Sequence, residues 1–552
     1  MILSAAIGSK KTLFPVTNGI HSLGGLIPHS QFYNISGLVI APFVERREHS
    51  EANVESRSAN GRTLLVVTVV IALLIGVVVV RRSRARAAAA HELRIQKVEN
   101  GLLVDPFVVT GVPPQTQSVV DAMRDEHIPA LSLAVVDNNR VAWARAYGVT
   151  QLGHGVPVTI HTQFSAGSLT KFVSALAVLT LVDQGKLELD RDIRSYLVSW
   201  QLPDPQAVVT LRELLSHSSG LSQHFPHSYP LGDPAPSTGE ILSGKLPART
   251  TRIEFDGKPG EKFDYSSAGF EVIQKVLEDV TAKTFPQVIQ EQVFTPAGMT
   301  ESTFEQPGPS NYDVRAVGHV EDDSGKLKPE PAMFPELASS GMWTTPSDLA
   351  RLLVRLQAEP RFLSDASFKA MITPVRENAG LGVFLVGQGD SLRFRARTSD
   401  GRPEDGFTGW LTSYASQGKA AVLMANSHTA FGKGFAVLRA VAREYEWPGY
   451  LDILPKPQYS RGVEAYVGTY KMDEPLSISD RGGSLVVSYS ELKNLPLLPS
   501  GEDSFVVNFE PVSDFVLKFH IGADGKADRL NLTTGFRHFE APRIGDRGTV
   551  AN

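Results

Sequence analysis

The sequence predicts an α+β fold preceded by a membrane helix and followed by a small antiparallel β domain. Three patterns lead to this prediction. Residues 63–80 form an uncharged apolar run, residues 128–182 contain a strand hairpin followed by a strongly apolar helix, and residues 463–545 alternate apolar with polar positions. A chain of 552 residues is too long for one compact core, so two or more folded units are expected.

The overall composition excludes several classes of function. The net charge is -5, which gives no indication of a nucleic-acid partner. The chain has no cysteine, so disulfides, thiolate catalysis and thiolate zinc sites are excluded. There is also no His-Glu-x-x-His spacing, and we expect neither a metal nor an organic cofactor.

The apolar run at residues 63–80 predicts a single transmembrane helix, because a span needs about 20 apolar residues. The alternative is a buried core helix, but β-branched residues dominate the run and arginines bracket it. The arginines that follow the run would place the C-terminal bulk in the cytoplasm, although large domains can cross regardless of flanking charge. These arginines are Arg81, Arg82, Arg84 and Arg86.

The remaining segments define the expected domain organisation. Residues 1–62 are expected to be a poorly ordered leader, and residues 81–114 a juxtamembrane linker. The main domain is expected at residues 115–447. A proline-rich linker at residues 448–462 then leads to a barrel-like β domain at residues 463–545.

The main domain opens with a predicted helix, a hairpin and a second helix. An amphipathic helix is expected at residues 118–127, followed by strands at residues 128–136 and 141–147 with a turn between them. Residues 172–182 are hydrophobic nearly all round, which is typical of a helix buried on most sides. Gly185 is a plausible end signal for that helix.

The pair Ser168 and Lys171 is the strongest candidate for catalysis, in the segment FSAGSLTK at residues 164–171. Positions i and i+3 of a helix share a face, so the two side chains would meet. A serine hydroxyl is a poor nucleophile unless a base removes its proton, and a desolvated lysine can be that base. The alternative for Ser168 is an ordinary helix N-cap. Two other Ser-x-x-Lys matches, at Ser416 and Ser490, fall in a turn and at a strand end.

From about residue 115 to 447, the chain resembles the serine β-lactamase and penicillin-binding-protein-like family. It is most similar to the class C-like branch of esterases, D-aminopeptidases and related peptidases. The matching segments are TQFSAGSLTK (162–171), LRELLSHSSGL (211–221), PGEKFDYSSAG (259–269), PAGM (296–299) and GMWTTPSDL (341–349). The resemblance implies a β-lactamase/transpeptidase-like fold, in which an antiparallel sheet is flanked by helices and a helical subdomain.

The resemblance also implies roles for individual residues. Ser168 would be the acyl-forming nucleophile, Lys171 its partner, and Tyr265 the second base or a proton relay. The alternative for Tyr265 is a core aromatic with a satisfied hydroxyl, and His217 is interpreted as a structural residue. The family has asparagine where this chain has Ser267, which implies a different anchoring of the substrate carbonyl.

The third block of the family, Lys-Thr-Gly or His-x-Gly, is altered in this chain. In one register the oxyanion-hole residue would be Pro403, which has no N–H. A register one residue earlier reads Ser399-Asp400-Gly401. It keeps a glycine near the substrate, and Arg402 supplies the N–H. We prefer this register and predict Gly401 and Arg402 as substrate or oxyanion residues.

The leading functional hypothesis is a serine hydrolase that acts through a Ser168 acyl-enzyme on a small-molecule or peptide substrate carrying an ester or amide. The alternative is a catalytically weak or inactive penicillin-binding-like sensor or binding protein, because the third block is altered. A scaffold with a vestigial core is a third possibility. The family resemblance places the catalytic domain on the external side of a membrane.

Overall fold

The computed structural model describes most of the chain beyond residue 55. The described ranges are 56–105, 107–223, 228–306, 314–358, 361–398, 406–451, 453–454, 459–490, 492–507, 515–534 and 537–545. The expected poorly ordered leader therefore lies almost entirely outside the described residues. The chain divides into two compact units, Met1–Ala85 and Arg86–Asn552.

The helix α1 (Ser56–Glu99) contains the apolar run and continues through the arginines that follow it. In the described part of the chain, no helix combines the length and apolar character that crossing a membrane requires. The predicted transmembrane helix is therefore not supported. The external position of the catalytic domain stays a prediction.

An antiparallel sheet forms the centre of the main domain, with the strand order β12-β13-β14-β15-β4-β5. Its strands are β4 (Ala130–Asp137), β5 (Arg140–Gly148), β12 (Phe384–Val386), β13 (Arg393–Arg397), β14 (Thr408–Tyr414) and β15 (Ala420–Ala425). The predicted hairpin is confirmed, because β4 pairs antiparallel with β5 and Asp137 lies opposite Arg140.

Helices cover both faces of this sheet. On one face, α3 (Leu169–Asp183) and α10 (Pro346–Gln357) contribute to the larger hydrophobic core. On the other face, α2 (Val119–Asp125) and α12 (Ala430–Glu444) pack with the last turns of α1. The helix α3 ends before Gly185, which adopts a φ of +69°. This is the end predicted for the apolar helix.

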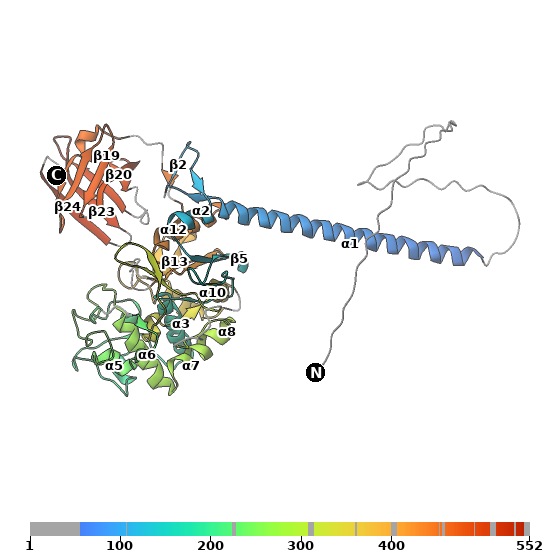
Figure 1. Ribbon diagram of the computed structural model, residues 1–552, viewed down its shortest axis with the longest axis horizontal. Helices are drawn as coiled ribbons and strands as arrows, with labels where there is room; N and C mark the ends of the chain where they lie inside the picture. Colours follow the sequence, from blue (N-terminus) through green and yellow to red (C-terminus); the bar gives the residue numbers. More distant parts are fainter. Residues whose placement is uncertain are drawn as a thin grey trace. The chain divides into compact units, whose positions relative to one another are not determined.

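Further helices form the helical subdomain, in which α6, α7 and α8 gather near α3 (Figure 1). They are α4 (Leu211–Leu215), α5 (Thr238–Ser243), α6 (Ala268–Thr281), α7 (Phe285–Ile289), α8 (Thr295–Ala297), α9 (Leu337–Ser340) and α11 (Asp365–Met371). Short strand pairs link the loops: β1 (Leu102–Leu103) with β3 (Thr116–Gln117), β2 (Val108–Val109) with β16 (Ile453–Leu454), β6 (Phe164–Ser165) with β11 (Trp343–Thr344), β7 (Tyr229–Pro230) with β10 (Ala332–Met333), and β8 (His319–Glu321) with β9 (Leu327–Pro329). The antiparallel sheet, the flanking helices and this subdomain form the predicted β-lactamase/transpeptidase-like fold.

The C-terminal tail folds into a closed antiparallel barrel made of β17 to β24, drawn in orange and red in Figure 1. Its strands are β17 (Gly468–Tyr470), β18 (Leu476–Asp480), β19 (Leu485–Tyr489), β20 (Leu492–Gly501), β21 (Ser504–Val507), β22 (Phe515–Ile521), β23 (Ala527–Thr534) and β24 (Arg537–Gly545). Pairing of β17 with β24 closes the barrel, which removes exposed strand edges. The predicted barrel-like β domain is therefore confirmed.

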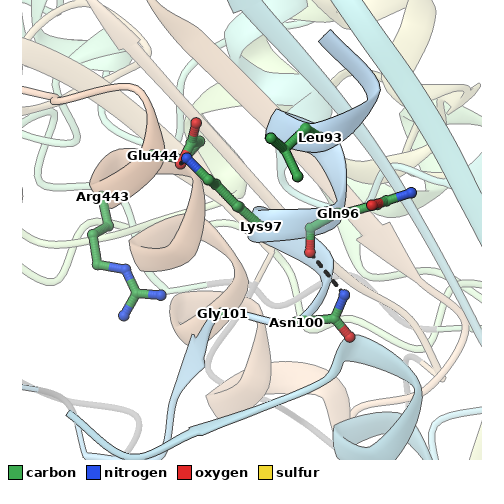
Figure 2. A pocket seen from close by; sticks show the side chains of 7 residues that line it. All are labelled: Leu93, Gln96, Lys97, Asn100, Gly101, Arg443 and Glu444. Atoms are coloured by element: carbon green, nitrogen blue, oxygen red, sulfur yellow. Dashed lines mark hydrogen bonds and ion pairs between the residues drawn. The ribbon is translucent and has the colours of Figure 1, made fainter. Parts of the chain in front are cut away.

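The C-terminal end of α1 belongs to the core of the main domain. Ile95 and Val98 are fully buried there, and the guanidinium of Arg94 lies 3.8 Å from the ring centroid of Tyr445. Beside this contact is a pocket of about 540 Å³, in which Lys97 and Glu444 form an ion pair at 3.5 Å (Figure 2). These contacts attach the end of α1 to α12.

Candidate active site

The candidate nucleophile lies in a tight turn between β6 and α3. Gly167 has a φ of +46°, and a Cβ at this position would lie only 3.1 Å from the Thr398 side chain. Glycine is therefore the residue that fits both the left-handed backbone and the close approach. Ser168 follows as the residue before α3, but its hydroxyl makes no capping hydrogen bond. The N-cap alternative considered from the sequence does not describe this serine.

The hydroxyl of Ser168 instead meets the two groups predicted to act on it. Lys171 Nζ donates a hydrogen bond to Ser168 Oγ at 3.1 Å, and the Tyr265 hydroxyl donates another at 3.0 Å. Ser168 and Lys171 are one helical turn apart, whereas Tyr265 is 97 residues further along the chain. All three side chains meet at one oxygen atom, which is the geometry expected of an activated serine.

Lys171 is held in a nearly dry environment. Its side chain is 3% exposed, and Nζ donates a second hydrogen bond to the carbonyl oxygen of Ser339 at 3.1 Å. The Nζ atom also lies 5.3 Å from the ring centroid of Tyr265 and 5.7 Å from that of Phe270. These contacts fix the amine beside Ser168 and limit its access to water.

The imidazole of His217 packs against the ring of Tyr265. The two ring centroids are 4.3 Å apart, and Phe384 stacks on the imidazole at 6.2 Å. Burial lowers the pKa of His217 to about 3, and the positive charge of Lys171 acts in the same direction. A neutral imidazole is therefore favoured near neutral pH. It can fix the orientation of the phenol, in agreement with the structural role inferred from the sequence.

Ser267 immediately precedes α6, two residues after Tyr265, and is 2% exposed. Among the residues that the structure describes, its hydroxyl has no hydrogen-bond partner. Buried polar groups are normally paired, so an unpaired hydroxyl next to a candidate active site suggests a substrate contact. The resemblance marked this position as a departure from the family pattern, but the sequence gave no indication that the hydroxyl would be unpaired.

The predicted third block starts close to the nucleophile turn. The strand β13 ends at Arg397, and the next residue, Thr398, faces Gly167. The residues predicted to complete the oxyanion hole, Gly401 and Arg402, lie outside the described residues, as do Asp400 and Pro403. Their predicted roles stay predictions.

Two features of this site were not anticipated from the sequence. The carbonyl of Ser339 in α9 accepts a hydrogen bond from Lys171, and the carboxylate of Glu271 is buried in α6 nearby. No sequence motif marks a backbone carbonyl. For Glu271, the available signal was one acidic residue among the apolar neighbours Phe270, Val272 and Ile273.

Comparison with known proteins identifies the family of the main domain. The family model described as Beta-lactamase matches residues 116–443. Protein flp of Staphylococcus aureus (strain N315) is 24% identical over 317 residues, which cover 55% of this chain and 61% of that protein. Penicillin-binding protein 4 of Amycolatopsis lactamdurans is 31% identical over 222 residues, which cover 39% of this chain and 55% of that protein. The alignments thus span 61% and 55% of these curated relatives.

Solved structures are also similar to this chain. The octameric penicillin-binding protein homologue from Pyrococcus abyssi has a TM-score of 0.49 at 21% identity, covering 77% of this chain and 98% of that one. The D-amino acid amidase from Ochrobactrum anthropi SV3, solved in complex with L-phenylalanine amide, has a TM-score of 0.48 at 21% identity. That similarity covers 58% of this chain and 97% of the amidase.

Proposed function

We propose, starting from the fact that this chain belongs to the Beta-lactamase family, that it is a serine hydrolase working through a Ser168 acyl-enzyme. One observation carries the proposal, namely that Lys171 Nζ and the Tyr265 hydroxyl converge on Ser168 Oγ at 3.1 and 3.0 Å. When a serine lies between an amine and a phenol, one group can remove its proton and the other can protonate the leaving group.

In the first step, the neutral amine of Lys171 takes the proton of Ser168. Its Oγ forms a bond with the carbonyl carbon of the substrate. The carbonyl π electrons move onto oxygen and give a tetrahedral intermediate. When the intermediate collapses, the bond to the leaving group breaks, and the Tyr265 hydroxyl or the Lys171 ammonium protonates that group. Water then attacks the carbonyl carbon of the acyl-enzyme ester. The bond to Ser168 Oγ breaks, this oxygen regains a proton, and the acid product is released.

The negative charge of the intermediate needs N–H donors. Within the described residues, no backbone carbonyl accepts a hydrogen bond from the N–H of Ser168. This N–H precedes α3, where helix N–H groups favour negative charge. We assign it as one oxyanion donor, and the predicted Arg402 N–H would be the second. One such donor typically contributes about 10²–10³-fold in rate.

The substrate is an ester, amide or peptide that is small enough to place its carbonyl beside Ser168. The unpaired hydroxyl of Ser267 is available to hold a polar group of that substrate. Because serine is shorter than the asparagine of the family pattern and has one donor, the contact reaches less far. This difference favours a substrate with a bulkier or more extended group at that position.

The proposal is tested with a fluorophosphonate probe and a series of aryl esters on the full chain. Wild-type protein should become labelled and should hydrolyse at least one ester, whereas Ser168→Ala should do neither. Ser416→Ala is the matched control, because it removes another Ser-x-x-Lys serine and should react like wild type. Labelling that survives in Ser168→Ala would exclude Ser168 as the nucleophile. A wild-type protein without labelling or hydrolysis would favour a non-catalytic binder.

A further inference from the structure

A buried carboxylate that the steps above do not use lies behind Lys171. Glu271 occupies the first turn of α6, and its side chain is 2% exposed. The helices α3, α6 and α9 pack against one another around it. A charged carboxylate in such surroundings is expensive unless a partner or a nearby opposite charge compensates.

Glu271 has no well-formed hydrogen bond in the described part of the chain, and Ser339 supplies only weak polar contacts. Burial raises the pKa of Glu271 to about 7, while the hydroxyl and N–H of Ser339 and the positive charge of Lys171 oppose that rise. The negative charge of Glu278 adds to the rise. Lys171 is therefore the cation that acts on this carboxylate.

Ser339 connects the two groups spatially. Its carbonyl accepts a hydrogen bond from Lys171 Nζ at 3.1 Å, while its hydroxyl and N–H act on Glu271. An ammonium group has three protons, and two of the Lys171 donor positions are directed at Ser168 Oγ and the Ser339 carbonyl. A buried ammonium and a buried carboxylate that share one neighbour form a pair whose total charge is zero.

Building on the proposed function, we propose that Glu271 is a positioning residue that supplies the counter-charge of Lys171 from behind Ser339. A carboxylate at this place stabilises the ammonium that Lys171 becomes when it accepts the proton of Ser168, so the dry site needs no outside counter-ion.

Other charged or titratable groups lie on the elements that surround the pair. Tyr265 contacts Ser168, and Glu278 lies further along α6. Glu336 precedes α9 and is also buried. His217 stays neutral near pH 7, because its pKa is lowered to about 3. Two interacting groups titrate as a unit, so the pH dependence of Ser168 reactivity reports on the pair of Lys171 and Glu271 together.

The test is the second-order rate constant for fluorophosphonate labelling of the full chain, measured from pH 5 to pH 10. Removing the carboxylate with Glu271→Gln or Glu271→Met leaves the ammonium of Lys171 without its counter-charge and favours the neutral amine. The pH at which labelling reaches half its maximum should therefore fall by about one unit, a tenfold change in the protonation equilibrium. Glu271→Asp keeps a carboxylate and should restore most of the wild-type profile.

Glu278→Gln is the matched control, because its carboxylate pairs with Lys275 at 3.3 Å and has the smallest influence on Glu271, so the midpoint should shift much less than in Glu271→Gln. Folded Gln and Met variants with the wild-type midpoint would overturn the inference while leaving the proposed function intact. Failure of both variants to fold would also overturn it, because Glu271 would then serve the fold. A wild-type protein that is not labelled at any pH would overturn the proposed function, and this inference with it.

Discussion

The interior of the C-terminal barrel and the wall behind Ser168, which contains Ser267 and Glu271, are both buried. They differ in whether their buried polar groups have hydrogen-bond partners. In the barrel, the Tyr466 hydroxyl donates to Asp503 at 2.7 Å, and the Tyr470 hydroxyl donates to the Tyr466 carbonyl at 2.8 Å. In the described part of the main domain, the buried oxygens of Ser267 and Glu271 have no such partner.

This difference distinguishes a region in which buried polar groups are paired from the region for which we propose chemistry. An unpaired buried polar group costs roughly 1–3 kcal/mol, so a purely structural core tends to avoid it. The barrel pairs its buried tyrosine hydroxyls and fills its centre with aromatic rings, among them Phe505 and Phe519, whose centroids are 5.5 Å apart. The wall behind Ser168 retains unpaired polar atoms, which is a pattern typical of functional sites.

The largest expected effect comes from removing the base. Lys171→Met should reduce fluorophosphonate labelling of Ser168 by about 10³-fold or more, because the serine loses the amine that accepts its proton. Lys275→Met, which removes a lysine in α6 that pairs with Glu278, should label within a few-fold of wild type. A reduction of less than tenfold in Lys171→Met would mean that another group deprotonates Ser168.

The next effect concerns the barrel and should leave the chemistry unchanged. Phe505→Ala removes a ring that is 1% exposed, which should cost about 3–5 kcal/mol of barrel stability in urea unfolding. The labelling rate of the folded protein should not change. Lys518→Ala, an exposed residue on the neighbouring strand β22, should change neither quantity. A labelling rate that falls in folded Phe505→Ala would show that the barrel takes part in the reaction.

A smaller effect is expected from the phenol of Tyr265. Tyr265→Phe keeps the ring that packs against His217 but removes the hydroxyl that contacts Ser168. Ester hydrolysis should fall by about 10²-fold, the lower end of general acid–base contributions. The matched variant Tyr229→Phe removes a hydroxyl that accepts a hydrogen bond from the Arg249 N–H and should retain wild-type turnover. An unchanged rate in Tyr265→Phe would assign the second proton transfer to Lys171 alone.

The smallest effect is a change of stability with pH. The pKa of His217 is lowered to about 3 from 6.5, so below pH 6.5 the unfolded chain binds the proton first and stability falls as the pH drops. The pKa of Glu271 is raised to about 7 from 4.5, so the native chain binds that proton first and stability rises as the pH drops from 7. Between pH 6.5 and 5.5, each of the two residues changes the free energy of unfolding by about 1 kcal/mol, with opposite signs.

Single variants should separate these two contributions. Between pH 6.5 and 5.5, the free energy of unfolding of His217→Asn should rise by about 1 kcal/mol relative to that of wild type. That of Glu271→Gln should fall by about the same amount. Urea unfolding at the two pH values measures both changes. Changes of the same sign in the two variants would contradict the opposed titrations.

The parts of the site that lie close together in sequence were the most predictable. Ser168 and Lys171 are three residues apart, and helix geometry alone brings them to one face. The hairpin of β4 and β5 and the barrel strands also follow from short patterns of apolar residues and turns. The transmembrane helix was predicted from the same kind of local pattern, but the described structure does not support it.

The sequence by itself determined the nucleophile turn, the buried helix α3 and the barrel, because each depends on the spacing of side chains along a short stretch of chain. The family resemblance predicted that Tyr265 acts with Ser168, but only the tertiary structure shows their contact across 97 residues, and only it brings Ser339 next to both Lys171 and Glu271. These contacts depend on how α3, α6 and α9 pack, and the burial that alters the titration of Glu271 and His217 arises from that packing.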